Sequence, residues 1–299
     1  MPFTLSHAAA VLPAVRTDGT GRARLVPAVL VAGSFAPDVT YYAASAVPEA
    51  MAFGDVTHGF PGVFTVDVAL AWALVGLWLL LREPLVALLP RARQHRVASL
   101  LRCGMPHARV EAGLVLRWYA SAALGALTHV VWDAFTHLDR WGMRVFPVLG
   151  REIAGSPLYW YLQYGGSAVA AVVIAVFLLR ALRRTPGGEP AGTRVLGSVP
   201  APTPVLRVPV LSVRDRWWAA ALIGGCAGVA AVRRAVRWWD HWGSVAKPYE
   251  LIPTVCFGAG AGLVVGVLLY AVAVRVWRPA PVPGGAGADD VERSRSAAR

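Results

Sequence analysis

Three residues whose side chains can do chemistry recur at intervals of four in one apolar stretch of the chain. His129, Asp133 and His137 stack along one face if this stretch is a helix, because residues four apart are neighbours on a helix surface. Imidazoles and carboxylates inside a membrane span are costly unless they pair, coordinate an ion or meet water. A His and an Asp at this spacing can chelate one divalent metal, for which zinc is our first choice and manganese or iron the alternatives. The simpler interpretation is a hydrogen bond between His129 and Asp133 at the membrane edge.

Other candidate ligands come from separate segments that we expect at the same edge of the membrane. His7 starts the first apolar piece, Asp38 follows the second, and His58 precedes the next apolar stretch. Each has a plainer interpretation, which is a helix cap for His7, a cap or turn former for Asp38 and a loop position for His58. Asp67 lies within an apolar stretch, where we expect it to support the ligands or the packing before we expect it to bind an ion. Convergence of the first three with the helical pair described above would favour a metal site.

The elements that must position these residues are membrane-spanning helices. Hydrophobic residues make up 56% of the 299-residue chain and charged residues only 15%, well below the roughly 25% of soluble domains. The apolar residues form blocks close to the ~20 residues with which a helix crosses a bilayer. The sequence therefore predicts an all-α, polytopic transmembrane helical bundle of about six spans, at 24–37, 61–82, 113–137, 158–182, 216–234 and 251–275.

The first predicted span is short for a complete crossing. A second short apolar piece, residues 5–15, precedes it, and an arginine-containing turn joins the two. We expect a helical hairpin that enters from the outer side and returns, which brings His7 near Asp38. The predicted organisation is a membrane core at 1–182 that holds the metal site, a disordered cytoplasmic linker at 183–215, a helical pair at 216–275 and a disordered tail at 276–299. The sequence leaves the oligomeric state open.

The positive charge of the chain follows its topology and not a nucleic-acid surface. The net charge is +12, but the arginines lie between apolar blocks without a concentrated basic face, so we expect no nucleic-acid binding. Segments 83–117 and 183–216 are rich in arginine and are predicted to be cytoplasmic, while segment 38–60 has no Lys or Arg and is predicted to face outward. His95 and His107 fall in the cytoplasmic segment, away from the other candidates. The loop after the fifth span breaks this pattern and leaves the topology of that span open; its basic residues are Arg233, Arg234, Arg237 and Lys247.

Several motifs together resemble a bacterial family of multi-pass membrane proteins of unknown function. They are Pro2-Phe3-Thr4-Leu5-Ser6-His7-Ala8, Gly33-Ser34-Phe35-Ala36-Pro37-Asp38, His58, the segment Thr128–His137 and the segment Pro157–Gly165. The motif order is similar to that of predicted inner-membrane metal-dependent hydrolases, and the resemblance covers about residues 2–180. It implies one metal site made from His7, Asp38, His58, His129 and Asp133. One departure is Gly59, where those hydrolases usually carry a Ser after the loop His.

The activity implied by the resemblance is metal-dependent hydrolysis at the outer face of the bacterial inner membrane, on a phosphoester or lipid-like substrate. A divalent ion lowers the pKa of a water that it binds towards ~7. Asp133 or Asp38 would act as ligand or general base, and His137 would orient groups or carry a proton. Arg140 and Arg144 would hold an anionic substrate, or simply anchor the chain to lipid head groups. The alternatives are an ion- or proton-coupled transporter and a structural membrane protein whose polar cluster locks the bundle.

Overall fold

Five long helices dominate the computed structural model, which describes residues 3–103, 111–138, 140–185, 208–243, 245 and 250–278. All five are long and apolar enough to cross a membrane. The first, Phe60–Ala87, consists of α5 (Phe60–Val63) followed by α6 (Val66–Ala87). The other four are Ala112–Ala134 (α8), Leu158–Arg184 (α10), Val213–Trp242 (α11) and Leu251–Trp277 (α12). The described residues contain one sheet, a hairpin of Glu152–Ile153 (β1) and Ser156–Pro157 (β2). The predicted all-α, polytopic helical bundle is therefore confirmed.

The N-terminal segment forms a hairpin whose second arm is too short to be a span. The first arm consists of η1 (Thr4–His7), α1 (Ala8–Val11) and η2 (Leu12–Ala14), and the second of α2 (Pro27–Phe35) and η3 (Ala36–Asp38), followed by α3 (Val39–Ala43). A β-bridge between Val15 and Gly21 closes the turn between the arms. The nine residues of α2 cover about 14 Å, roughly half of a ~30 Å bilayer core. Residues 24–37 thus form a short inserted helix where we expected the first span.

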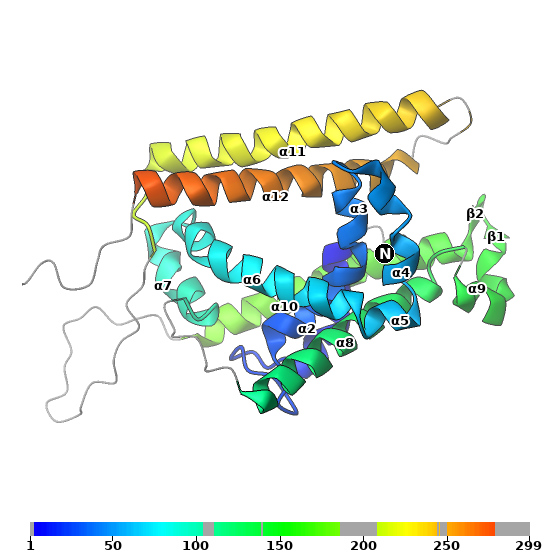
Figure 1. The fold of residues 1–299 in the computed structure, drawn as a ribbon, viewed down its shortest axis with the longest axis horizontal. Coiled ribbons are helices and arrows are strands. Elements are labelled where there is room, and N and C mark those ends of the chain that lie inside the picture. The colour runs from blue at the N-terminus through cyan, green and yellow to red at the C-terminus, as the bar shows by residue number, and fades with distance from the viewer. Residues whose placement is uncertain are drawn as a thin grey trace, which may run out of the picture.

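Prolines set both ends of α2. Pro27 occupies its first turn, where the missing N–H costs nothing, and Pro37 follows its last residue and prevents a regular continuation. The short helix packs against α6 and α8, as Figure 1 shows. A broken helix at membrane depth is tolerated where protein surrounds it. The irregular backbone around Asp38 is therefore a consequence of these prolines and of the bundle that encloses them.

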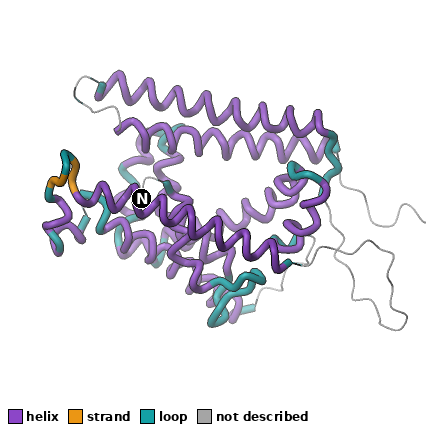
Figure 2. The backbone as a smooth tube through the Cα atoms, turned by 180° about the vertical axis from the view of Figure 1, so that it is seen from behind, coloured by secondary structure: helices purple, strands orange, loops and turns teal. Residues whose placement is uncertain are grey.

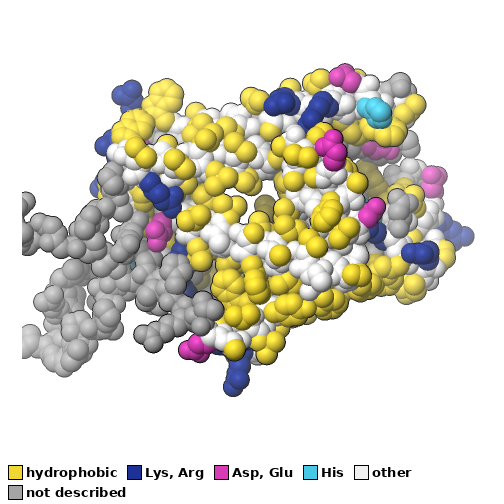
Figure 3. Space-filling model, in the orientation of Figure 1, with side chains coloured by type: hydrophobic (Ala, Val, Ile, Leu, Met, Phe, Trp, Pro, Cys, Tyr) yellow, Lys and Arg dark blue, Asp and Glu magenta, His cyan; other side chains and the backbone are white. Residues whose placement is uncertain are grey.

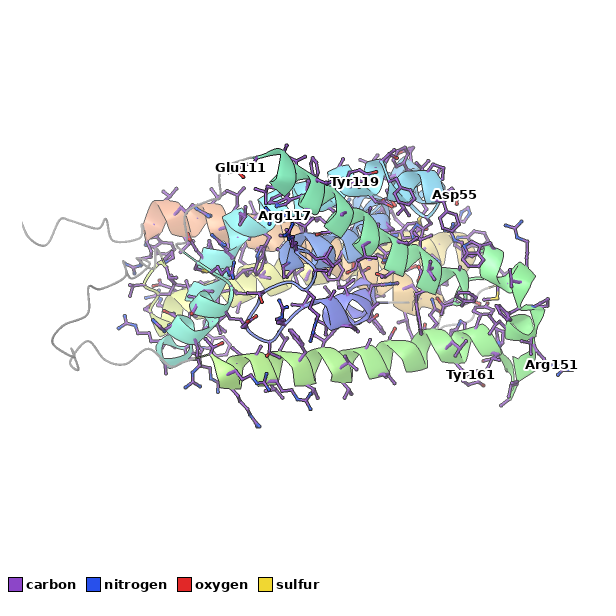
Figure 4. All side chains as sticks on the ribbon, turned by 90° about the horizontal axis from the view of Figure 1, so that it is seen from below. Asp55, Glu111, Arg117, Tyr119, Arg151 and Tyr161 are labelled. Atoms are coloured by element: carbon purple, nitrogen blue, oxygen red, sulfur yellow. The ribbon has the colours of Figure 1, made fainter. Side chains whose placement is uncertain are left out.

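Short elements occupy the two ends of the bundle. One end carries α7 (Arg91–Leu100), and the other carries η4 (Pro48–Met51), α4 (Gly54–Thr57), α9 (Trp141–Val145) and η5 (Pro147–Gly150). Figure 4 separates the ends: Glu111 lies toward the α7 end, whereas Asp55, Arg151 and Tyr161 lie toward the α9 end. The segments that carry Asp38 and His58 thus lie at the end opposite α7.

The two C-terminal helices form a layer of their own along one side of the core, as Figures 1 and 2 show from opposite directions. They pack closely because α12 presents glycines to α11: a Cβ on Gly262 would lie 2.2 Å from the carbonyl oxygen of Cys226. Helix α11 runs to Trp242, eight residues beyond the predicted fifth span at 216–234. Its arginines do not end the helix, because Arg234 donates hydrogen bonds to the Tyr41 carbonyl (2.6 Å) and the Ser45 hydroxyl (2.7 Å).

The visible surface supports a membrane setting. In Figure 3 hydrophobic side chains cover most of the face, and the charged groups gather near its margins. Most of the predicted linker at 183–215 and most of the predicted tail at 276–299 lie outside the described residues. Of the described part of the linker, Val208 and Leu211 are buried against Tyr270 and Val274 of α12. This stretch therefore packs on the C-terminal pair.

Candidate metal centre

Four of the predicted ligands meet in one buried cluster. Asp38 of η3, His58 after α4, and His129 and Asp133 of α8 offer ligand atoms that all lie within 4.8 Å of one another. All four residues are buried, with exposed fractions of 7% or less. His129 and Asp133 stand four residues apart on α8, with His129 Nε2 3.4 Å from Asp133 Oδ2, as the spacing predicts. The site therefore joins three segments that are distant in sequence.

Backbone carbonyls fix how both histidines face the carboxylates. The Nδ1 of His129 lies 2.8 Å from the Ser34 carbonyl oxygen, and the Nδ1 of His58 lies 2.9 Å from that of Gly54. Each Nδ1 can therefore donate to its carbonyl, and a neutral ring that does so has its lone pair on Nε2. An N–H donated to a backbone carbonyl is the usual way in which a metal-binding imidazole is oriented.

The Nε2 atoms then face carboxylate oxygens at distances that suit a bound ion. Asp38 Oδ1 lies 3.5 Å from the Nε2 atoms of both His58 and His129, and Asp133 Oδ2 lies 3.7 Å from that of His58. These separations exceed the 2.7–3.2 Å of a good N–H···O hydrogen bond. Ligands about 2.0–2.1 Å from a tetrahedral zinc stand about 3.3–3.4 Å apart. The four atoms thus fit the donor set and the spacing of a small divalent ion.

Close helix packing brings the Ser34 carbonyl to His129. A Cβ on Gly33 would lie 2.4 Å from the Ala122 carbonyl oxygen, and a Cβ on Gly125 would lie 2.2 Å from that of Leu30. Only glycine allows this approach of the α2 and α8 backbones. Gly33, the first residue of the Gly33–Asp38 motif, therefore supports the site by letting α2 and α8 lie close together.

The opening motif of the chain lies directly beside the ligands. The Thr4 hydroxyl donates a 2.5 Å hydrogen bond to Asp38 Oδ2, which leaves Oδ1 facing the histidines. The ring of His7 stacks on that of His129, with centroids 3.6 Å apart and planes 11° apart. His7 Nε2 lies 3.5 Å from Asp133 Oδ1, the oxygen other than the one nearest His129. His7 thus borders the group of four without being part of it.

Comparison with known proteins places this chain in a family. A family described as a domain of unknown function (DUF4184) matches residues 1–272. The chain belongs to this family. No curated protein and no solved structure matches it. The resemblance to a family of unknown function is thus confirmed, and the DUF4184 description names no activity.

Two buried groups at the site of this DUF4184 chain have shifted pKa values. Burial raises the pKa of Asp38, but His129 and His58 lower it by more, so the pKa of this carboxyl lies below its ordinary value. Burial, together with His129, holds the pKa of His7 well below 6.5. Asp38 is therefore ionised at neutral pH, which is the form that binds a cation.

His137 lies at the mouth of the cluster, one turn beyond Asp133. Its side chain is 39% exposed, and its Nδ1 lies 3.6 Å from Asp133 Oδ2. Burial lowers the pKa of His137, against the opposing effect of Asp133, so the ring is neutral at pH 7. On the other side of the ring, Nε2 lies 3.2 Å from the amide nitrogen of Gln163 in α10.

The remaining candidates fall into distinct positions. Arg140 lies near the mouth, with Nη2 3.4 Å from the Tyr41 hydroxyl, and the Tyr41 ring stacks on His58. Arg144 is exposed in α9, and neither oxygen of the buried Asp67 has a hydrogen-bond partner among the described residues. The other histidines lie elsewhere: His95 is exposed in α7, His241 is exposed near the end of α11, and His107 lies outside the described residues.

Several contacts that shape the site left no clear sign in the sequence. Thr4 stood out there only as part of the opening motif, yet its hydroxyl orients Asp38. Tyr41 was not among the candidates, yet its ring stacks on that of His58. Gln163 lies in the segment Pro157–Gly165, one of the motifs on which the family resemblance rests. That resemblance was the signal in the sequence that could have pointed to Gln163.

Proposed function

We propose that this protein is a membrane-embedded, metal-dependent hydrolase that acts on a phosphoester or lipid-like substrate. One observation carries the proposal: two imidazoles hold Nδ1 against backbone carbonyls and turn Nε2 toward two buried carboxylates. In neutral rings the Nε2 lone pairs then face anionic oxygens in a buried space, and a cation between them removes the repulsion. A divalent ion there would supply a Lewis acid and an activated water at neutral pH.

We assign Asp38, His58, His129 and Asp133 as the metal ligands. His7 was predicted as a fifth ligand, but a metal lies close to the plane of the imidazole that binds it. The planes of His7 and His129 are nearly parallel and their centroids are 3.6 Å apart, so no single point lies in both. We therefore propose that His7 orients Asp133 through Oδ1. Zinc is our first choice of metal, and manganese or iron would leave more coordination positions for water.

The mouth of the site supplies the groups that handle protons and substrate. A neutral, part-exposed imidazole beside Asp133 is suited to accept or return a proton, which is the role that we propose for His137. Arg140 lies within reach of the Tyr41 hydroxyl and presents a guanidinium that can bind a phosphate. Asp38 and Asp133 hold the ion in this proposal, and the general base at the mouth is therefore His137.

Hydrolysis fits the position of the cluster better than transport does. On the α7 side of the cluster, α2, α6 and α8 pack an apolar group of residues that includes Val29, Val75 and Ala122. A proton or cation relay needs ionisable or wet groups along its path, and the residues of this apolar group supply none. A site that opens at one end is suited to a substrate that arrives from that end.

We further propose that the site faces outward from the bacterial inner membrane. Segment 38–60 leads into the site and has no Lys or Arg, whereas α7 at the other end carries several arginines. The positive-inside rule then puts the α7 end in the cytoplasm. Cysteine substitution at the exposed Asp55, labelled by a membrane-impermeant maleimide in whole cells, tests this orientation, and protection from the reagent contradicts it.

The first experiment measures metal in the detergent-purified protein by elemental mass spectrometry. We expect close to one divalent ion per chain in the wild type, loss of that ion in His129→Ala, and full retention in the control His95→Ala. Chromogenic phosphomonoesters and phosphodiesters, and phospholipids in mixed micelles, are then tested as substrates with and without chelator. Chelator-sensitive turnover of any of them is the expected result.

His137→Ala separates a hydrolase from a structural metal site. We expect this variant to keep its metal and to lose turnover by about 10²–10⁴-fold, the usual share of general acid–base catalysis. Metal retained by the wild type without turnover of any of these substrates would point to a structural site. Ion flux into proteoliposomes that depends on His129 would point to transport.

A further inference from the structure

A second hollow lies at the α7 end of the described bundle, away from the metal centre. Its volume is about 690 Å³, and it is enclosed by the hairpin turn at residues 15–22, the end of α7 and the end of α10. In Figure 1 the turn after α1 lies toward α7, whereas α4 and α9 lie at the other end. None of the predicted metal ligands lines this cavity. Its chemistry is therefore separate from that of the site.

The polar wall of the cavity is basic. Three guanidinium groups, those of Arg16, Arg22 and Arg184, face one carboxylate, that of Asp18. The turn itself satisfies this carboxylate, because Asp18 Oδ1 accepts hydrogen bonds from the backbone N–H (2.8 Å) and the hydroxyl (2.6 Å) of Thr20. These bonds from Thr20 lower the pKa of Asp18. The wall thus keeps an excess of positive charge.

The arginines have donors left for a ligand. Arg16 uses Nη1 to bond the Gly21 carbonyl at 2.7 Å, and Arg184 uses Nη1 to bond the Thr17 hydroxyl at 2.9 Å. A guanidinium has five N–H donors, so most of them are not used by these contacts. Within the described ranges no carboxylate lies within ion-pair distance of any of the three arginines. An anion in the cavity would supply the missing partner.

The lining also contains apolar side chains. They are those of Leu12, Pro13, Leu100 and Phe177. A cavity lined by both guanidiniums and apolar groups matches an amphiphile with an anionic head. Phosphate is the anion that arginine forks bind best, through paired N–H···O contacts.

We propose that this cavity binds a phosphate ester, with the arginines on the phosphate and the apolar side chains on the attached glycerol or acyl chain. The arginine-rich α7 puts this end at the cytoplasmic side of the membrane, where anionic phospholipids are concentrated. A soluble glycerol phosphate offers the same head without the tail. The two sources share one chemistry, and the experiment tells them apart.

Native mass spectrometry of the delipidated full-length protein tests the proposal with phosphatidylglycerol, phosphatidylcholine and glycerol 3-phosphate as probes. We expect phosphatidylglycerol to bind about tenfold more tightly than phosphatidylcholine, which has no net negative charge. The cavity variant, with Arg16, Arg22 and Arg184 each changed to Gln, should lose this preference. The matched control changes Arg91, Arg93 and Arg96 of α7 to Gln; these side chains are exposed at the same end and carry the same total charge.

Competition by glycerol 3-phosphate at similar concentration would assign the site to soluble phosphate esters, and lack of competition would assign it to the lipid; both support the proposal. Equal losses in the two triple variants would overturn it, because they would reveal only general attraction to the surface. An unchanged preference in the cavity variant would overturn it as well.

If the triple variant fails to fold, Arg22→Gln carries the test alone. The Arg22 side chain makes no hydrogen bond within the described residues, so its loss removes ligand contacts without removing a structural one. An affinity for phosphatidylglycerol equal to that of the wild type would then overturn the proposal. Metal content should stay at the wild-type level in every cavity variant, since the two sites share no residue.

Discussion

In the described part of residues 3–185 short helices and loops surround the four proposed metal ligands, whereas α11 (Val213–Trp242) and α12 (Leu251–Trp277) are long helices that hold none of them. The core repeatedly interrupts its helices, as at Pro37 and at Gly59, and each interruption brings a side chain or a carbonyl into the site. The C-terminal pair keeps its helices regular and packs them through glycines such as Gly262. Both regions lie in the same apolar setting.

The difference between the two regions shows where a membrane protein tolerates irregular backbone. The Ser34 and Gly54 carbonyls accept hydrogen bonds from the rings of His129 and His58, and a carbonyl without a donor would be costly against lipid. The two long helices lie along one side of the core and contact it near both ends. Arg234 of α11 donates to the Tyr41 carbonyl near one end. Near the other end the Tyr270 hydroxyl of α12 donates to the Pro84 carbonyl at 2.8 Å. Function is therefore expected in the interrupted helices, and equal changes in the two regions test this expectation.

The largest contrast should come from removing one carboxylate in each region. Asp38→Asn replaces an ionised ligand by a neutral amide, and we expect metal affinity to fall by more than about 100-fold, since a ligand is lost outright. Asp240→Asn, at an exposed position in α11, should leave affinity unchanged. Titration of the metal-free protein with zinc, followed by calorimetry, measures both. A wild-type affinity in Asp38→Asn would remove this residue from the ligand set.

The next contrast compares two glycines in helices. Gly125→Ala puts a Cβ 2.2 Å from the Leu30 carbonyl oxygen, so α2 and α8 must separate, at a cost of about 3 kcal/mol. Gly228→Ala in α11 meets nothing within 4 Å and should stabilise its helix by up to about 1 kcal/mol. Thermal unfolding in detergent should therefore shift in opposite directions for the two variants. A shift in the same direction would show that the close approach of α2 and α8 is not needed.

The sequence predicted the residues of the buried cluster better than it predicted their supports. His129 and Asp133 follow from helical spacing, and Asp38 and His58 follow from placing four segments at one edge of the membrane. The carbonyls of Ser34 and Gly54 leave no mark in a sequence, because every residue has one. Residues 24–37 were counted among the six spans, although their length already predicted one arm of a hairpin, because hydropathy does not register where Pro27 and Pro37 limit the helix. The fifth span was drawn too short because arginines lower the hydropathy of α11 without ending the helix.

A smaller effect is expected from removing a support and leaving the ligands in place. Thr4→Val keeps the shape of the side chain but removes the hydroxyl that bonds Asp38 Oδ2. Partners of this kind are typically worth 10–100-fold in metal affinity, and we expect a loss in that range. Thr254→Val in α12 is the control in the C-terminal pair and should have no effect. If zinc binds Thr4→Val as tightly as the wild type, the opening motif does not serve the metal.

The smallest contrast concerns the contact between the two regions. Arg234 joins α11 to the backbone at Tyr41 and the hydroxyl of Ser45, and its guanidinium lies 5.6 Å from the Phe257 ring centroid. Arg234→Gln should lower stability by about 1.5 kcal/mol, because hydrogen bonds from a buried charged group are lost. Arg233→Gln, one residue away and exposed, is the matched control and should unfold at the wild-type temperature.

The zinc affinity of Arg234→Gln shows whether the contact made by Arg234 also supports the site. None of the ligands bonds Arg234, so the zinc affinity of Arg234→Gln should equal that of the wild type even though the protein unfolds at a lower temperature. If affinity fell together with stability, the C-terminal pair would be holding Tyr41 against His58, and the division between an active core and a supporting pair would have to be given up. If only the stability falls, the C-terminal pair contributes to the stability of the protein and not to metal binding, which depends on the core alone.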